Sequence, residues 1–207
     1  MSTPPLPQDV LDAFHATTGF MPDDEGQALY EAAASARPGT WLEIGTYCGK
    51  STQLLAHAAR RVGSRLVTVD HHHGSEENQP GWEWHDTSML DERTGRLDTL
   101  PAFRRTWDEH VKDVVSIVVA TTAQVATWWR TPVEFLFLDG NHVEEMAQHD
   151  YAAFAPHVSV GGLLAVHDVF PDPNDGGQAP WHVVERALGD GFEQVSQTGS
   201  LRILRRR

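Results

Sequence analysis

Two short polar motifs in the second half of the chain carry side chains that could do acid–base and metal chemistry. They are Asp139-Gly140-Asn141-His142, after the mainly apolar run 134–138, and His167-Asp168, after the apolar run 163–166. Carboxylates bind divalent cations, and a neutral imidazole accepts a proton near pH 7. If both runs are parallel strands of one sheet, the motifs lie at the same edge, where ligands bind. The pattern therefore predicts a site that combines two carboxylates with two imidazoles.

Each motif also has an ordinary structural interpretation. Asp, Gly and Asn are common turn residues, and Asn141 suits the cap of a helix. Asp168 alone could likewise belong to a turn. A second pattern in the first half of the chain favours the chemical interpretation.

Residues 40–52, Thr-Trp-Leu-Glu-Ile-Gly-Thr-Tyr-Cys-Gly-Lys-Ser-Thr, predict a strand, a glycine turn and the start of a helix. Glu43 interrupts the apolar strand with a charge that needs a partner when buried. Gly45 and Gly49 allow a sharp turn and a close approach to a ligand. Only three residues separate these glycines, so neither the dinucleotide fingerprint nor the P-loop pattern matches.

A second apolar strand, 65–69, is followed by Asp70. In a βαβ unit, an acidic residue at about this distance from the glycine turn binds ribose hydroxyls. A turn residue at the strand end is the alternative. Combined with the stretch 40–52, the ribose interpretation is favoured.

These motifs resemble those of class I S-adenosylmethionine-dependent methyltransferases, and 43–51 is especially similar to the catechol O-methyltransferase branch. The resemblance covers about residues 25–207. It implies an α/β fold: a doubly wound, Rossmann-like, seven-stranded sheet with helices on both faces. It also implies that the residues around S-adenosylmethionine are Glu43, Gly45, Tyr47, Gly49, Ser51, Asp70 and His71.

The second-half motifs match the metal-dependent members of this family. The resemblance implies that Asp139 and Asp168 hold Mg²⁺ and that His142, three positions after Asp139, is the general base. Histidine at this position is similar to the sugar branch, whose members resemble macrocin O-methyltransferase, whereas catechol enzymes carry lysine. His167 stands where an acidic residue is usual. We expect it to ligate a softer ion such as Mn²⁺, to contact substrate, or to point away.

The long polar segment 71–98 exceeds the roughly 2–6 residues of an ordinary connection between strand and helix. We interpret it as a substrate-binding lid, with a solvated acidic loop as the alternative. Carboxylates hydrogen-bond sugar hydroxyls, and indole rings pack on sugar C–H surfaces. The predicted substrate residues are Glu76, Trp82 and Trp84 in this segment and Trp181 in a second loop, 171–182. The tract His71-His72-His73 is not expected to hold one metal, because adjacent side chains of an extended chain point to opposite sides.

We therefore predict a metal-assisted, S-adenosylmethionine-dependent O-methyltransferase acting on a carbohydrate hydroxyl. The 1-OH of a methylated mannoside or oligomannoside is the candidate acceptor suggested by resemblance. The enzymatic alternative is a methyltransferase for catechols, phenols or other small molecules. The non-enzymatic alternative is a regulatory protein that binds S-adenosylmethionine.

The net charge and composition of the chain restrict the kinds of molecule it is expected to bind. The chain has 207 residues and a formal net charge of −13, which argues against nucleic acids and anionic membranes as partners. No apolar run reaches the length of a membrane span. A single cysteine excludes an internal disulfide, so we expect a cytoplasmic protein. The pair Trp128-Trp129 is interpreted as core or as an interface in a homodimer.

The predicted elements alternate between strands and helices, as in a doubly wound sheet. A proline-rich start predicts a flexible arm over 1–24, followed by one methyltransferase domain over 25–207. Strands are expected at 41–45, 65–70, 114–119, 134–138 and 163–166, and an antiparallel pair at 192–196 and 200–205. Helices are expected at 24–36, 51–62, 99–112, 121–130, 142–158 and 181–188.

Overall fold

A computed structural model of the chain describes residues 6–75 and 86–207. Three of the predicted substrate residues, Glu76, Trp82 and Trp84, lie outside these ranges. The remaining predicted site residues lie within them.

The sheet has seven strands in the order β3-β2-β1-β4-β5-β7-β6. Strands β1 to β5 pair in parallel, and β7 pairs antiparallel with both β5 and β6. The strands are β1 Thr40–Ile44, β2 Arg65–Asp70, β3 Val115–Val119, β4 Val133–Leu138, β5 Val158–Val166, β6 Phe192–Thr198 and β7 Leu201–Arg206. This arrangement confirms the predicted doubly wound α/β sheet, although β5 begins earlier than expected.

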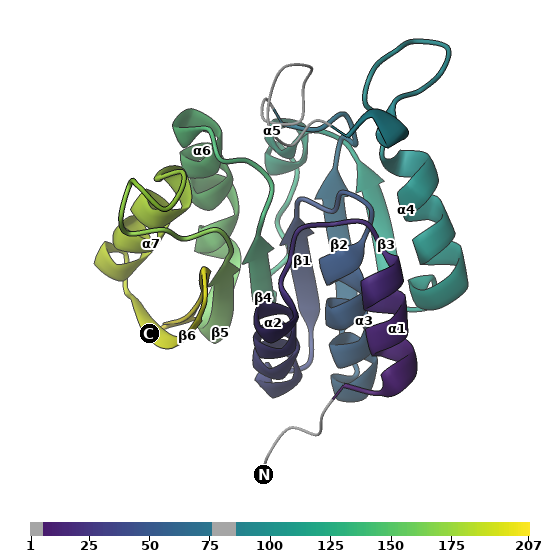
Figure 1. Cartoon of the computed structure of the whole chain (residues 1–207). Helices are drawn as coiled ribbons and strands as arrows, with labels where there is room; N and C mark the ends of the chain where they lie inside the picture. Colours follow the sequence, from purple (N-terminus) through teal and green to yellow (C-terminus); the bar gives the residue numbers. More distant parts are fainter. Residues whose placement is uncertain (1–5, 76–85) are drawn as a thin grey trace.

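Helices cover both faces of the sheet, as Figure 1 shows. They are α1 Gln8–Ala16, α2 Asp23–Ser35, α3 Lys50–Val62, α4 Leu100–Thr106, α5 Thr122–Ala126, α6 Glu144–Phe154 and α7 Ala179–Gly189. A π-helical turn, Trp107–Val111, extends α4, and single 3-10 turns occupy Thr87–Met89 and Ala155–His157. Helices α1 to α3 pack on one face, and α5 to α7 pack on the other.

The central strand β4 shows why the fold forms. Its run of apolar residues alternates between the two faces, because successive side chains of a strand point to opposite sides. Phe135 and Phe137 belong to the core under α2 and α3, whereas Leu136 and Leu138 belong to the core under α6 and α7. A continuous apolar sequence is therefore required, since a parallel sheet is buried on both faces.

The segment 1–24, predicted as a flexible arm, contains helix α1. Phe14 of this helix is buried in the core, and Leu6 and Met21 are buried on either side of it. The Lys50 ammonium donates to the carbonyl oxygen of Phe14 at 3.0 Å, which fastens α1 to the start of α3. The described part of this segment therefore belongs to the folded domain rather than to a free arm.

The two adjacent tryptophans after α5 have different environments. Trp129 is buried and packs edge-on against Phe154, whereas Trp128 is 55% exposed. One member of the predicted pair is thus a core residue. Within 6–75 and 86–207, every helix lacks the combination of length and apolar character that crossing a bilayer requires.

Candidate active site

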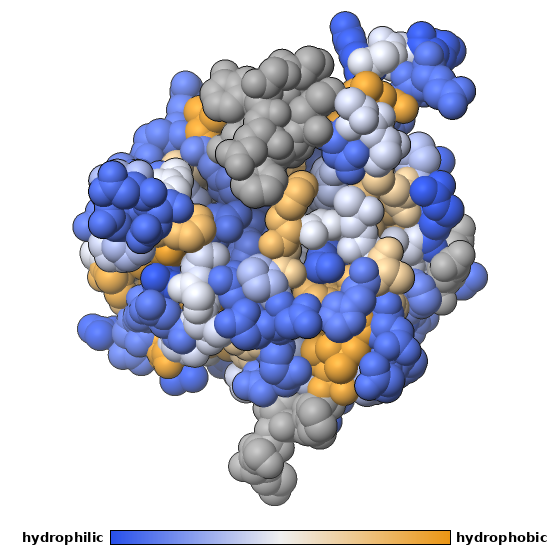
Figure 2. Space-filling model, viewed as in Figure 1, coloured by the Kyte–Doolittle hydropathy of each residue, from blue (hydrophilic) through white to orange (hydrophobic). Residues whose placement is uncertain are grey.

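A cavity of about 630 Å³ lies at the carboxyl edge of the parallel strands. This volume is within the usual range for small-molecule pockets. Strand ends contribute Gly45, Asp70, Asp139 and Asp168 to its wall. The segment 18–21 and the loop 175–177 add further walls. Figure 2 shows this side of the molecule, where hydrophilic side chains (blue) predominate over smaller apolar patches (orange).

The turn after β1 brings two strand ends into contact. Gly45 has a φ of +88°, and a Cβ atom there would overlap the backbone carbonyl of Asp139. Only glycine therefore allows the end of β1 to lie this close to the end of β4. Tyr47, two residues later, has a φ of +50°, a strained conformation for a non-glycine residue. Such strain is typical of binding loops that the surrounding structure holds in place.

Asp70 supports this turn through backbone hydrogen bonds. Its Oδ2 atom accepts from the amides of Thr46 and Tyr47, each at 2.9 Å, and Oδ1 accepts from the His72 amide at 2.6 Å. A carboxylate has about four acceptor positions, so roughly one remains for a ligand in the cavity. Asp70 thus shapes the loop and can also bind a hydroxyl group.

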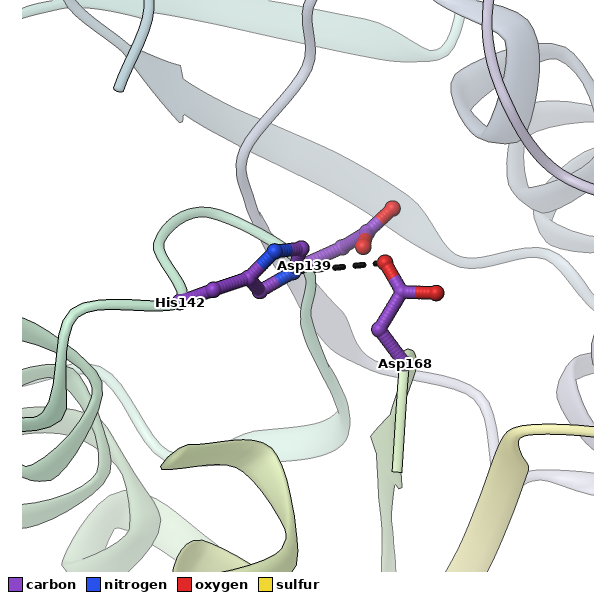
Figure 3. Close-up of side chains that lie close together, drawn as sticks. All are labelled: Asp139, His142 and Asp168. Atoms are coloured by element: carbon purple, nitrogen blue, oxygen red, sulfur yellow. Dashed lines mark ion pairs between the residues drawn. The ribbon is translucent and has the colours of Figure 1, made fainter. Parts of the chain in front are cut away.

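Asp139, His142 and Asp168 converge on the opposite side of the cavity, as Figure 3 shows. Each offers one ligand atom, and the three atoms lie within 4.8 Å of one another. The Nε2 atom of His142 lies 3.3 Å from Oδ2 of Asp168. Burial acts to raise the pKa of Asp168, but hydrogen bonds from His142 and His167 outweigh it and hold that pKa below its usual range.

This cluster fits a divalent cation. Asp139 and Asp168 supply carboxylate oxygens, which Mg²⁺ prefers and Mn²⁺ also accepts, and the His142 imidazole lies beside them. All three side chains are half-buried and line the open cavity, so an ion can reach them. In the part of the chain that the structure describes, it is the one group of histidine, cysteine and acidic side chains with this geometry.

His167 also contributes to the cavity wall but is not a member of the cluster. Its side chain is 4% exposed; Nε2 is 2.6 Å from Glu25 Oε2, and Nδ1 is 3.1 Å from Asp139 Oδ1. Both nitrogens face carboxylates, which only accept, so both carry protons. Burial acts to lower the pKa of His167, but Asp139, Asp168 and Glu25 together raise it above its usual range. A nitrogen that carries a proton has no lone pair for a metal, so the predicted ligand role of His167 is corrected to a hydrogen-bonding one.

Glu25, which was not predicted as a site residue, lies in the first turn of α2 and is 4% exposed. Its neighbours Asp23 and Asp24 make the stretch look like the ordinary acidic start of a helix. No spacing rule connects this position with residue 167. The only local sequence signal of close packing was the glycine that follows, Gly26, which is buried in the structure.

Comparison with known families decides what kind of domain carries this site. A family model described as a methyltransferase domain matches residues 42–169, which is more than half of the 207-residue chain. The chain belongs to this methyltransferase family. The match begins in β1 and ends just after Asp168, so it spans both halves of the cavity wall.

Solved structures share the fold of this methyltransferase at low sequence identity. An SAH-bound Podospora anserina methyltransferase, PaMTH1, is 15% identical, covers 99% of this chain and 90% of its own, and has a TM-score of 0.65. A Bacillus cereus O-methyltransferase in complex with SAH is 16% identical, with coverages of 96% and 90% and a TM-score of 0.58. The O-methyltransferase NovP is 18% identical, with coverages of 88% and 79% and a TM-score of 0.67.

Most of the cofactor residues expected in this methyltransferase line the cavity: Gly45, Tyr47, Ser51, Asp70 and His71. Glu43 and Gly49 do not. Glu43 is fully buried beneath the turn, where it accepts hydrogen bonds from Ser51 and Thr52, each at 2.7 Å. Burial raises the pKa of Glu43 to about 7. The structure therefore gives Glu43 an indirect position, with Ser51 between it and the cavity.

The three consecutive histidines of the methyltransferase face different neighbours. His71 lines the cavity, whereas His72 is buried and stacks on Phe103 with ring centroids 5.4 Å apart. The Nδ1 atom of His73 lies 3.1 Å from the carbonyl oxygen of Leu97. The rings of His71 and His73 stack on each other with centroids 6.0 Å apart, whereas His72 points into the protein.

Aromatic side chains at the cavity differ from those that were predicted. Trp181 is half-buried on α7 and packs against the core under α6 and α7 instead of lining the cavity. Phe20 and Phe170 do line it, and Phe20 is 54% exposed beside Tyr47, with ring centroids 5.6 Å apart. An isolated phenylalanine in a connecting segment carries no sequence signal for ligand binding, so neither was singled out.

Proposed function

We propose that this methyltransferase uses S-adenosylmethionine to methylate a hydroxyl oxygen. The observation that supports this most directly is the cavity that combines the glycine turn and Asp70 with the cluster of Asp139, His142 and Asp168. When bound, S-adenosylmethionine supplies an electrophilic methyl group on a sulfonium sulfur. Gly45, Asp70 and the other cavity residues of the first half would hold it. Solved structures with the same fold include O-methyltransferases named as SAH or SAM complexes.

His142 is the proposed general base. Its imidazole lies at the cavity wall, 3.3 Å from the Asp168 carboxylate, which can stabilise the positive charge that the ring gains with the proton. A neutral histidine is suited to accept a proton near pH 7. Deprotonation matters here because a neutral hydroxyl is a weak nucleophile.

Asp139 and Asp168 are the proposed holders of a divalent cation, Mg²⁺ or Mn²⁺. When bound, the ion would favour the alkoxide form of the acceptor. The remaining contribution of the chain is orientation. Holding the oxygen in line with the methyl carbon and sulfur can contribute roughly 7–11 kcal/mol to the lowering of the barrier.

The proposed acceptor is a carbohydrate, with the 1-OH of a methylated mannoside or oligomannoside as the candidate. A sugar hydroxyl is a weaker acid than a phenol, which agrees with a site offering both a base and a cation cluster. Side chains and rings suited to sugar hydroxyls and C–H surfaces line the cavity: Thr18, Phe20, Ser75, Thr99, Asn141, Phe170 and Asp175. The histidine at 142 also favours the sugar branch over the catechol branch.

A transfer assay tests the proposal. The protein is incubated with methyl-labelled S-adenosylmethionine and either methylated mannosides and oligomannosides or catechols, with and without EDTA. We expect label on the sugar hydroxyl, loss of transfer in EDTA, and recovery on addition of excess Mg²⁺ or Mn²⁺. Transfer to catechols alone would contradict the carbohydrate assignment. Full activity in EDTA would contradict the cation, and cofactor binding without any transfer would favour the regulatory alternative.

A further inference from the structure

Three side chains from distant parts of the sequence form a line that ends at the proposed cation site. Glu25 lies in the first turn of helix α2, His167 follows strand β5, and Asp139 follows strand β4. The Nε2 atom of His167 donates to Glu25 Oε2 at 2.6 Å, and Nδ1 donates to Asp139 Oδ1 at 3.1 Å. Asp139 forms the end of this line that faces the cavity, where it meets His142 and Asp168 in the cluster.

The turn between β6 and β7 fixes the inner end of the line. The Ser200 amide donates to Glu25 Oε1 at 2.6 Å, and the Ser200 hydroxyl donates to Oε2 at 3.1 Å. Gly199 has a φ of +50°, and a Cβ atom there would overlap the Glu25 carboxylate. The turn is thus shaped around this carboxylate, and both of its oxygens have partners.

A fixed Glu25 restricts the His167 ring to one orientation. Because the ring is planar, anchoring Nε2 also sets the direction in which Nδ1 donates. That direction determines where Asp139 Oδ1 lies, and so how the carboxylate is presented to the cavity. His167 is 4% exposed, so water cannot readily replace either of its carboxylate partners.

We propose that Glu25 is a positioning residue for the cation site, acting through His167 on Asp139. The inference rests on the proposed binding of a divalent cation by Asp139 and Asp168. It adds a requirement that the cluster alone does not contain: the first turn of α2 and the β6–β7 turn must be in place for the site to bind a cation tightly. Glu25 does not line the cavity, so its effect on S-adenosylmethionine is expected to be small.

Mn²⁺ binding to the whole protein, followed by the electron paramagnetic resonance signal of the free ion, tests the inference. We expect Glu25→Gln to weaken Mn²⁺ binding about 10- to 100-fold, as for other residues that orient metal ligands. Glu31→Gln is the matched control, since Glu31 is exposed on the same helix, and it should bind Mn²⁺ as the wild type does. Calorimetric titration with S-adenosylmethionine should give nearly equal affinities for all three proteins.

The outcomes separate this inference from the proposed function. A wild-type protein that binds no Mn²⁺ would overturn the cation role of the cluster, and the role of Glu25 with it. Equal Mn²⁺ affinities in the wild type and Glu25→Gln would overturn the role of Glu25 alone. A parallel loss of Mn²⁺ and S-adenosylmethionine affinity in Glu25→Gln would show general disruption and would also overturn it.

A milder variant covers the case in which Glu25→Gln does not fold. Ser200→Ala removes only the hydroxyl donor to Glu25 and keeps the backbone donor. We expect Mn²⁺ binding about two- to tenfold weaker, a smaller loss than in Glu25→Gln because the Ser200 amide still holds the carboxylate. Unchanged Mn²⁺ affinity in a folded Ser200→Ala protein would contradict the proposal that Glu25 positions Asp139 through His167.

Discussion

The two halves of the cavity hold their carboxylates in different ways. On the β1–β2 side, Asp70 accepts three hydrogen bonds from backbone amides. On the β4–β5 side, Asp139 and Asp168 face the imidazoles of His142 and His167. Backbone donors are fixed by the fold, whereas the His142 imidazole at the cavity wall can accept a proton, and the carboxylates beside it can bind a cation. The β1–β2 side of the cavity, the first half, therefore has a fixed shape, whereas the β4–β5 side, the second half, can take part in chemistry.

This difference predicts that substitutions in the two halves change different measurements. The second half should affect turnover with little change in cofactor affinity. The first half should affect stability and cofactor affinity together. The following experiments, from the largest expected effect to the smallest, either separate the two halves further or show that the distinction does not hold.

Replacing His142 should have the largest effect on turnover. We expect His142→Ala to lower kcat about 10²- to 10⁴-fold, because the general base is lost, while the Kd for S-adenosylmethionine stays near the wild-type value. Steady-state kinetics and calorimetry measure the two quantities. His71→Ala is the control from the first half, since His71 lines the same cavity. It should weaken cofactor binding more than it slows turnover, and near-normal kcat in His142→Ala would remove this residue from the mechanism.

Gly45→Ala tests the contact that joins the two halves. The positive φ should cost about 1–3 kcal/mol of unfolding free energy, and overlap with the Asp139 backbone should cost a similar further amount. Gly63→Ala is the matched control, because Gly63 has a φ of +75° but an added Cβ atom would meet nothing within 4 Å. Denaturant unfolding of both variants isolates the overlap. Equal losses would show that the close approach of β1 and β4 is unimportant.

Asp70→Asn removes the negative charge of the carboxylate to which three backbone amides donate hydrogen bonds. We expect a loss of about 1–3 kcal/mol in unfolding free energy, because amides of the turn lose a charged acceptor. Affinity for S-adenosylmethionine should fall in the same variant, since the turn and the ribose contact change together. Thermal unfolding and calorimetric titration provide the two readouts. A stable variant with weak cofactor binding would show that Asp70 binds ligand without shaping the loop.

The last experiment measures a pH dependence of stability due to Glu43. Burial raises the pKa of this carboxyl from 4.5 to about 7, so the folded state holds its proton more tightly than the unfolded state. The resulting stabilisation is complete below about pH 4.5 and is lost as the pH rises towards 7. Glu43→Gln should abolish this part of the decline in unfolding free energy, with Glu31→Gln as the exposed control. Parallel pH curves for the wild type and Glu43→Gln would contradict the prediction.

Much of the fold could be predicted because its signals are local. Three mainly apolar runs are followed by a polar residue, Asp70, Asp139 or His167, which marks the end of a strand. Parallel pairing places these strand ends at one edge of the sheet. The proximity of Asp139, His142 and Asp168 follows from that rule together with the three-residue step from Asp139 to His142. The start of β5 was missed because Gly161 and Gly162 look like a break, although the strand continues through them.

The supporting contacts could not be predicted because they depend on packing between distant segments. Glu25 lies 142 positions before His167, and its sequence context is that of an ordinary helix start. Glu43 was assigned to the cofactor, whereas hydrogen bonds from Ser51 and Thr52 place it under the turn. In both cases the residue type was informative, but the partner depends on how helices pack against the sheet.

The contact between Ser200 and Glu25 also has a consequence for biosynthesis. The residues that hold the cluster in place include Glu25 and Ser200, which lie far apart in the sequence. Translation must therefore reach Ser200 before all of them are present. A nascent chain that ends at residue 168 already carries Asp139, His142 and Asp168 but lacks the turn that holds Glu25. Tight cation binding at this site is therefore expected only after the β6–β7 turn has been synthesised and has docked against α2.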